Sequence, residues 1–201
     1  MSDVELMFGA RFAKQFVNKY LEKELPSRLV TYRNGWCLDD ESLPDPLEYL
    51  TYEPVGLDTW PTIITLVIST NEILRSDYST NYDPMYRVQY SMRTYVWVRG
   101  DDAQMATDMR DNLMTVLRSA MLDNQCLKAE ASVYPYGGVL IDEGTFREEF
   151  SDLTLLKGDR VMCGAYLAYD LTLNETVARE TIADSFNTEL LIGTILEMSE
   201  E

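Results

Sequence analysis

Few residue types in this chain could carry out catalysis or hold a metal ion. Histidine is absent from all 201 residues, which excludes His-based triads, His-ligated metals and the usual general base at neutral pH. The three cysteines, Cys37, Cys126 and Cys163, lie far apart without C-x-x-C spacing, so we predict free, buried thiols and no zinc site. No nucleotide-binding or hydrolase motif is present either. We therefore predict a protein that is not an enzyme, with no catalytic residue, metal or cofactor.

The carboxylates are spaced in a way that suits neither hydrolysis nor calcium binding. A glycosidase needs two carboxylates that face each other across a cleft, whereas adjacent acids at 142/143 and 148/149 would point to opposite sides of a strand. Residues 39–58 hold seven acids and no base, but they lack the spaced oxygens and glycine of a calcium loop. We expect a solvated loop here, and its candidate lumen or loop carboxylates are Asp39, Asp40, Glu41, Asp45 and Glu48.

The charge balance limits the partners of the chain. Seventeen basic and 34 acidic side chains give a formal net charge of −17. Such a chain is poorly suited to gripping a phosphate backbone or anionic lipid through a broad basic face. The charge indicates a soluble, self-repelling surface, or less commonly a DNA mimic or a channel wall past which DNA slides. No stretch reaches the roughly 18 apolar residues of a membrane span, so we expect no membrane partner.

One segment has a clear strand pattern and leads into a helix. Apolar and polar residues alternate over residues 86–98, which predicts a long half-buried strand. Gly100-Asp101-Asp102 ends it and caps a helix that runs to about Leu122. Arg87 and Arg93 lie on the polar face of this strand, and we expect them to meet carboxylates of a neighbouring strand or subunit.

The other elements follow from periodicity and turn residues. An N-terminal helix is predicted to end before Pro26, followed by a hairpin around Asn34-Gly35 and a buried strand over residues 60–69. A hairpin or bent strand is predicted around residues 135–138, an acidic loop over 142–152 and a strand over 160–172. Together these predict an α+β fold, an antiparallel sheet with the N-terminal and central helices packed on one face.

Two segments outside these elements offer candidate contacts. Residues 1–172 are predicted to form one domain, and 173–201 an acidic C-terminal extension or arm that could be helix or extended chain. Its apolar run contributes the interface candidates Leu190, Leu191 and Ile192. Tyr78 and Tyr82 are further candidates in a polar loop. We expect the loops at 78–83 and 39–58 to be mobile in the free protein and to order on a partner.

A family resemblance enters through residues 86–113. There the aromatic strand ends in Trp97-Val98-Arg99-Gly100, and the following helix carries Arg110-Asp111 and a leucine face. This stretch resembles the tail terminator and related neck or tail-completion proteins of long-tailed bacteriophages. Trp60-Pro61-Thr62-Ile63-Ile64 is similar to the strand that often precedes the long one in that family. The resemblance covers roughly residues 3–122, and the part after Glu143 is less typical of the family.

The resemblance implies a structural virion protein, assembled in the host cytoplasm. It implies a ring, usually a hexamer, that ends the tail tube and joins the head connector. Its partners would be further copies of the chain, the tail tube protein, the head-tail connector protein, and DNA that passes through the lumen without specific binding. The alternatives are an acidic DNA-mimic inhibitor, a non-catalytic host regulatory or binding domain, and, close in kind, a connector or tail tube subunit.

Overall fold

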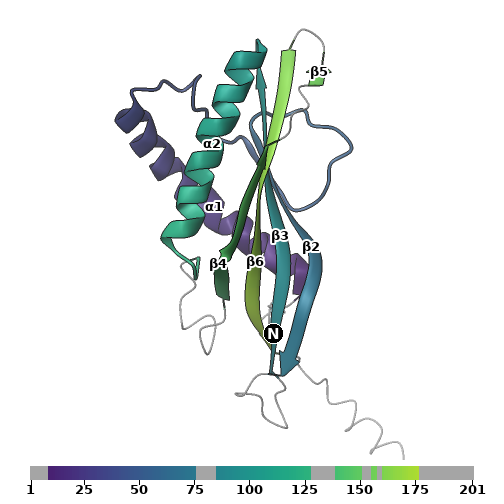
Figure 1. Ribbon diagram of the computed structural model, residues 1–201. Coiled ribbons are helices and arrows are strands. Elements are labelled where there is room, and N and C mark those ends of the chain that lie inside the picture. Colours follow the sequence, from purple (N-terminus) through teal and green to yellow (C-terminus); the bar gives the residue numbers. More distant parts are fainter. Residues whose placement is uncertain (1–8, 76–84, 128–138, 151–154, 158–159, 177–201) are drawn as a thin grey trace, which may run out of the picture.

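The chain folds into two long helices and a sheet (Figure 1). The computed structural model describes residues 9–75, 85–127, 139–150, 155–157 and 160–176. The elements in chain order are α1 (Gly9–Trp36), β1 (Glu48–Leu50), β2 (Thr62–Arg75), β3 (Met85–Gly100), α2 (Ala103–Asp123), β4 (Val139–Phe150), β5 (Leu155–Lys157) and β6 (Arg160–Thr176). The predicted α+β class is confirmed.

The sheet has β3 and β6 at its centre. The strand order is β1-β2-β3-β6-β4, and the short β5 pairs with one end of β6. The neighbours β2/β3, β3/β6 and β4/β6 are antiparallel, as predicted, whereas β1 runs parallel to β2, so the sheet is mixed. The strand predicted over 160–172 continues to Thr176, four residues past the predicted domain boundary.

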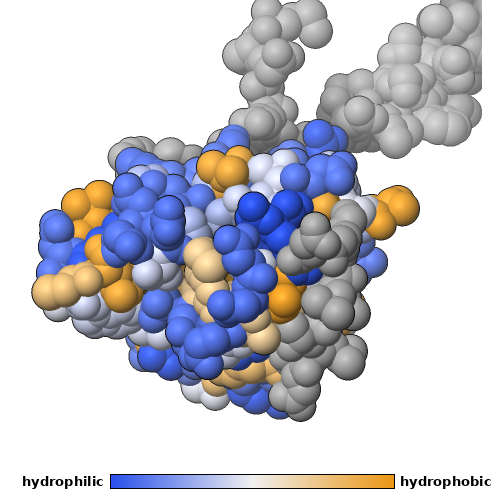
Figure 2. Space-filling model, turned by 90° about the horizontal axis from the view of Figure 1, so that it is seen from above, coloured by the Kyte–Doolittle hydropathy of each residue, from blue (hydrophilic) through white to orange (hydrophobic). Residues whose placement is uncertain are grey.

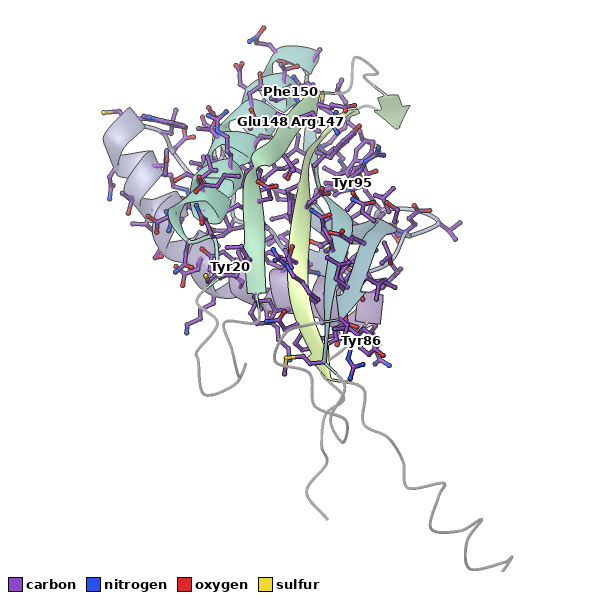
Figure 3. All side chains as sticks on the ribbon, turned by 60° about the horizontal axis from the view of Figure 1, so that its bottom comes forward. Tyr20, Tyr86, Tyr95, Arg147, Glu148 and Phe150 are labelled. Carbon is purple, nitrogen blue, oxygen red and sulfur yellow. The ribbon has the colours of Figure 1, made fainter. Side chains whose placement is uncertain are left out.

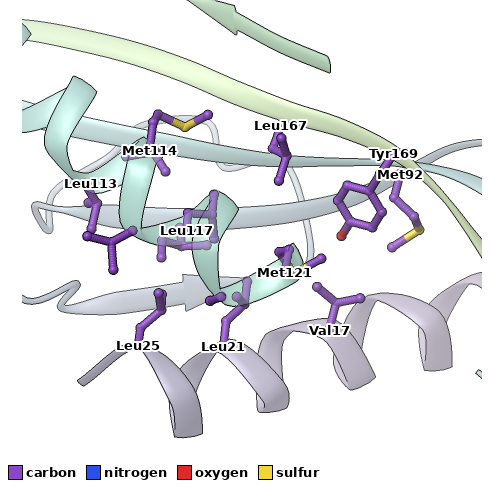
Figure 4. Close-up of a cluster of buried hydrophobic side chains, with 14 of the residues drawn as sticks. Val17, Leu21, Leu25, Met92, Leu113, Met114, Leu117, Met121, Leu167 and Tyr169 are labelled. Atoms are coloured by element: carbon purple, nitrogen blue, oxygen red, sulfur yellow. The ribbon is translucent and has the colours of Figure 1, made fainter. Parts of the chain in front are cut away.

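One large core joins both helices to the sheet. Alternate residues of β3 and β6 are buried, which is the period of two that the sequence showed. They belong to the same cluster as the inner stripes of α1 and α2 (Figure 4). The fully buried side chains of this layer include Val17, Leu21 and Leu25 of α1 and Leu113, Met114, Leu117 and Met121 of α2. α2 contacts β3 and β6, and α1 contacts α2 and β2.

The first helix is longer than predicted, and the predicted hairpin around Asn34-Gly35 is wrong. α1 passes through Pro26, which is exposed, and continues to Trp36. A proline inside a helix removes one hydrogen bond, but here the bond is lost on the solvent side. Burial of Leu25 and Leu29 on either side of the exposed Pro26-Ser27 outweighs that loss.

The end of α1 also shows why the turn signal misled. Cys37 has a φ of 56°, and the Leu38 N–H donates to the Arg33 carbonyl at 3.0 Å. This six-to-one hydrogen bond is the Schellman arrangement of a helix C-terminus. Cys37 therefore occupies the left-handed position that glycine usually fills, and Gly35 remains helical.

The prediction of an acidic loop over 142–152 is also wrong, because β4 extends to Phe150. The strand pairs with β6 on both sides of an irregularity between Asp142 and Arg147. Its acids lie outward or are paired, as Glu148 is with Arg118 of α2 at 2.7 Å. β5 pairs antiparallel with the start of β6, with Lys157 opposite Arg160. The hairpin or bent strand predicted around residues 135–138 lies outside the described residues.

α2 begins as the sequence predicted. Asp102 is its N-cap, and its Oδ1 accepts from the Met105 N–H at 2.8 Å. Gly100 ends β3 so close to α2 that an added Cβ would lie 2.7 Å from the Ala106 backbone nitrogen. A backbone atom inside a helix has little room to move, so glycine is needed here for packing.

We expect opposite stability changes from two glycine-to-alanine substitutions. Gly100→Ala should lower the free energy of unfolding by about 1–3 kcal/mol, because the new methyl group meets the backbone of α2. Gly35→Ala is the matched control. Gly35 is helical with no atom within 4 Å of its added Cβ, so alanine should raise the stability by about 0.5–1 kcal/mol. Urea unfolding of both variants measures the difference, and equal effects would contradict the packing role of Gly100.

Two further findings concern the thiols and the helices. All three cysteines are free, and Cys163 is buried as predicted, whereas Cys37 and Cys126 are exposed, against the prediction of buried thiols. Within the described residues, neither helix is long and apolar enough to cross a membrane.

Candidate functional site: the open face and edges of the sheet

The sheet has a second face that the main core does not use. It is formed by the odd-numbered residues of β3 from Arg87 to Arg99 and the even-numbered residues of β6 from Met162 to Asn174, and we call it the open face. Apart from Gly164, these residues are half-buried or exposed. Both arginines proposed from the sequence, Arg87 and Arg93, lie on it.

Near the β1 end, the open face is apolar and partly covered. Leu50, Ile64 and Leu66 form a small second cluster with Leu57, Tyr95 and Trp97 packed against it. Trp97 lies over Gly164, where an added Cβ would be 2.8 Å from the indole ring. The segment between β1 and β2 supplies Leu57, so this end of the face is closed by the chain itself.

Arg93 is held by aromatic rings. Its guanidinium lies 4.7 Å from the centroid of the Tyr166 ring, and its Nη1 donates to the Tyr95 hydroxyl at 3.5 Å. The two tyrosine rings contact each other with centroids 5.0 Å apart. The hydrogen bond with Tyr95 raises the pKa of Arg93 further, with smaller contributions from Tyr166 and Glu149. Arg93 is thus a cation–π partner within its own sheet. Its pairing with a carboxylate of a neighbouring strand or subunit stays a prediction.

Glu149 completes this group from β4. The Tyr166 hydroxyl donates to Glu149 Oε2, and this hydrogen bond raises the pKa of Tyr166. Arg147, two residues earlier, pairs in register with Ala168, and Ala168 pairs on its other side with Arg93. Arg93 and Arg147 therefore lie on either side of the Ala168 methyl group. Arg147, Glu148 and Phe150 follow one another along β4 (Figure 3).

A polar row crosses the same face beside these arginines. The Ser91 hydroxyl donates to Asp170 Oδ1 at 2.6 Å, and Asn71 Nδ2 donates to Ser91 Oγ at 2.6 Å. Thr145, in the irregular part of β4, accepts from the Asp170 backbone N–H at 2.8 Å. The row thereby links β2, β3, β6 and β4.

The arginines and the polar row line one hollow of about 610 Å³. Its charged lining residues are Arg93, Arg147, Glu149 and Asp170, two of each sign. A balanced, open and hydrogen-bonding surface of this kind suits a polar protein contact. No local sequence pattern indicates this hollow, because the register of β4 against β6 decides which side chains meet.

The acidic segment after α1 is anchored to the body of the protein. Arg33 forms ion pairs with Asp40 and Asp45, each at 3.0 Å, and its Nε donates to the Leu43 carbonyl at 2.7 Å. Leu43 itself is fully buried. Two of the candidate carboxylates are therefore neutralised, and the segment has fixed contacts that its composition did not reveal.

The other candidate carboxylates have separate positions. Hydrogen bonds from the Ser42 hydroxyl and backbone lower the pKa of Asp39. Glu48 belongs to β1, where it pairs with Thr62. Glu41 is exposed. In the described part of the chain, no three acidic or cysteine side chains are grouped so that they could hold a metal ion.

One edge of the sheet carries exposed apolar side chains. β1 pairs with β2 only from Thr62 to Ile64, and among the described residues no strand covers the same edge from Thr65 onward. There the exposed fractions of Ile68, Ile73 and Leu74 are 47%, 63% and 48%. Arg87, an interface candidate from the sequence, pairs in register with Leu74. We call residues 65–75 the β2 edge.

The remaining interface candidates, Tyr78, Tyr82, Leu190, Leu191 and Ile192, lie outside the described residues. A scan against protein-family models found no match. A search of curated proteins likewise found no significantly similar sequence.

Proposed function

We propose that this chain is a structural subunit of a homo-oligomeric ring, most simply a hexamer, that ends the tail tube of a long-tailed bacteriophage. The ring would contact the tail tube protein on one side and the head-tail connector protein on the other. The assignment to this class of virion protein rests on the resemblance of residues 3–122. Within that range, the described residues form α1, β1, β2, β3 and α2.

The observation that supports self-assembly is the β2 edge. An uncovered strand edge with apolar side chains readily pairs with another chain, and soluble proteins usually protect such edges with charges or prolines. On the β2 edge Ile68, Ile73 and Leu74 are exposed, and Glu72 and Arg75 are the charged residues beside them. An interface would remove these side chains from water.

The opposite side of the sheet offers a different surface. β4 is the last strand of the order, and Leu140 and Phe150 on it are 39% and 44% exposed. A ring requires two unlike surfaces on each subunit that meet head to tail. The β2 edge and the β4 edge are two such surfaces, at opposite ends of one sheet, so successive subunits could continue the sheet around the ring.

The charge of the chain is compatible with a lumen through which DNA passes. Carboxylates repel phosphates, whereas clustered lysines and arginines would bind them strongly. Glu41 and the other acids of the 39–48 segment are the candidates for such a lining, with Asp40 and Asp45 already balanced by Arg33. No specific DNA site is part of the proposal.

We expect charge on the β2 edge to weaken the ring while the subunit stays folded. The double substitution Ile73→Asp and Leu74→Asp places two carboxylates at exposed positions. Subunit affinity should fall by about 2 kcal/mol or more, roughly 30-fold, because the interface would have to bury two charges. Native mass spectrometry at graded concentrations measures this, with electron microscopy of tail particles as the test of location.

The matched control is Val55→Asp. Val55 is a fully exposed apolar residue in the segment between β1 and β2, away from the β2 edge. It should leave assembly unchanged. A wild-type chain that is monomeric and absent from assembled tails would refute the proposed function. Normal assembly of the double variant would instead place the interface elsewhere.

A further inference from the structure

The strands at the two borders of the sheet carry opposite charges on the same face. β2 contains a single acid, Glu72, and β4 contains a single base, Arg147. Glu72 pairs in register with Gln89, and Arg147 with Ala168, so both side chains belong to the open face of the sheet. Both are exposed, and neither forms an ion pair with a residue that the structure describes.

Arg147 lies beside carboxylates that other groups already hold. Glu148, the next residue of β4, pairs with Arg118 at 2.7 Å. Glu149 accepts a hydrogen bond from the Tyr166 hydroxyl. A guanidinium without a carboxylate partner is unusual in a chain with 34 acids and 17 bases. Arg147 is therefore suited to a carboxylate from outside its own subunit.

The directions of the strands allow β2 of one subunit to pair with β4 of the next. The neighbours β2/β3, β3/β6 and β6/β4 are antiparallel, so β2 and β4 run in opposite directions. Subunits that stand side by side in a ring share one orientation, so β4 of one copy is antiparallel to β2 of its neighbour. This contact leaves free the end of the molecule shown in Figure 2, where the described residues are mostly hydrophilic with apolar ones in small groups.

Face and charge together select one register for this contact. Strand pairing keeps the side chains of one face together, so Glu72 must lie opposite an open-face residue of the neighbour's β4. The candidates are Leu140, Asp142, Arg147 and Glu149. Two of them are acids that would repel Glu72, and the leucine offers no charge. Arg147 is the candidate that pairs with it.

The same register covers an exposed apolar side chain of the β2 edge. With Glu72 opposite Arg147, Ile73 comes to lie opposite Phe146, and both face the core side of the sheet. Ile73 is 63% exposed within the subunit, and Phe146 is half-buried. A β-branched side chain opposite an aromatic ring stabilises a pair of strands. One register thus supplies both an ion pair and an apolar contact.

The register also fits a closed ring. Within one subunit, Glu72 shares a row with Gln89 of β3, whereas Arg147 shares a row with Arg93 through Ala168. The two rows are four residues apart along β3, about 13 Å at roughly 3.3 Å per residue. Each copy is displaced by this length over the four strands β2, β3, β6 and β4, which lie about 4.8 Å apart. The resulting strand tilt of about 35° is a tilt at which sheets close.

We propose that Glu72 of one subunit pairs with Arg147 of the neighbouring subunit and fixes the register in which the β2 and β4 edges meet. The proposal rests on the self-assembly proposed above and names the residues of its contact. Arg147 lines the β4 side of the hollow on the open face, so the neighbour's carboxylate closes that side. Arg93, on the other side of the Ala168 methyl group, adds a second positive charge to the site.

A charge swap tests the pair in the full-length protein. Glu72→Arg and Arg147→Glu each place like charges opposite each other, and each should weaken subunit association about tenfold or more. The double variant Glu72→Arg/Arg147→Glu restores opposite charges and should recover most of the affinity. Native mass spectrometry at graded concentrations measures association. Both positions are exposed, so the melting temperature of the monomer should stay at the wild-type value.

A matched control separates this pair from a general effect of charge. Arg87 is exposed on the same face, but it pairs in register with Leu74 of its own chain. Glu72→Arg combined with Arg87→Glu has the same net charge as the swap. It should associate as weakly as Glu72→Arg alone.

Disulfide formation measures the register independently of charge. The exposed thiols are first removed by Cys37→Ser and Cys126→Ser. In that background, Glu72→Cys with Arg147→Cys should give subunits joined in series on mild oxidation, because residues opposite each other in paired strands come within disulfide reach. Leu74→Cys with Arg147→Cys, on the same face but two residues out of register, should give few joined subunits.

Failure of this pair differs from failure of the ring. The pair is overturned, and the ring stands, if rings form while the charge swap associates no better than the single variants. The same holds if either single variant assembles like the wild type, or if residue 147 is joined more readily to residue 74 than to residue 72. Monomers at every concentration would refute both proposals.

Discussion

Leu117→Ala should lower the free energy of unfolding by about 3–5 kcal/mol. Leu117 is fully buried in the middle of α2 and belongs to the core cluster that joins α1, α2, β3 and β6. Its truncation removes apolar contact and leaves a cavity whose walls come from separate elements, which relax only in part. The layers on both sides are long helices and central strands, so collapse around the cavity is limited.

The same helix provides the control. Leu122→Ala changes the same residue type five positions along, where the side chain is 40% exposed. We expect a loss of less than about 1 kcal/mol there, because water already contacts the side chain. Urea unfolding at pH 7, followed by circular dichroism, gives both values. Similar losses for the two variants would contradict the layered core.

Raising the pH above 10 should destabilise the protein steeply. Burial raises the pKa of Tyr169 and of Tyr90 well above the ordinary value of 10, and for Tyr90 the hydrogen bond to Glu175 adds to it. Burial raises the pKa of Tyr49 as well. Above pH 10 these hydroxyls lose their proton in the unfolded chain but keep it in the folded one. The folded state then holds more protons, so stability falls as pH rises toward the folded pKa values, and it is unaffected below pH 10.

The slope gives the size of the effect. Each buried tyrosine approaches about 1.4 kcal/mol per pH unit only once the unfolded hydroxyl is fully ionised, and from pH 10 to 11 it contributes about 1 kcal/mol. Tyr49, Tyr90 and Tyr169 together therefore remove about 3 kcal/mol over this interval. Urea unfolding at pH 8 to 11 measures the slope, and tyrosinate absorbance shows which tyrosines ionise only on unfolding. Tyr169→Phe should reduce the loss of stability per pH unit by the contribution of one buried tyrosine. Tyr52→Phe, at a 59% exposed position, should leave it unchanged. Ionisation of all 13 tyrosines near pH 10 in the folded protein would contradict the prediction.

Elements whose signal is local were predicted well. The alternation over 86–98 and 160–172 became β3 and β6, and the stripe after Asp102 became α2 with the expected cap. In these segments the apolar period, the end signals and the burial all favour the same structure. No distant partner had to be known.

Elements whose local signal conflicts with their packing were predicted wrongly. Pro26 and Asn34-Gly35 favour a break and a turn, yet α1 continues because Leu25 and Leu29 are buried in the core. The acids of 142–150 favour a loop, yet β4 forms because β6 provides a pairing partner and Arg118 a countercharge. Burial and pairing with distant residues are larger energies than local propensity, and a single sequence does not contain them explicitly.

The candidate surfaces are likewise decided by packing and pairing with distant residues. The sequence by itself determined the acidic charge, the absence of histidine and the placement of Arg87 and Arg93 on a polar strand face. Only the tertiary structure placed Arg147 across Ala168 from Arg93, because a strand irregularity sets that register. Only the meeting of the β2 and β3 ends put Trp60 beside Arg99. Side chains that converge from strands far apart in the chain are positioned by packing, and packing is decided by the whole fold at once.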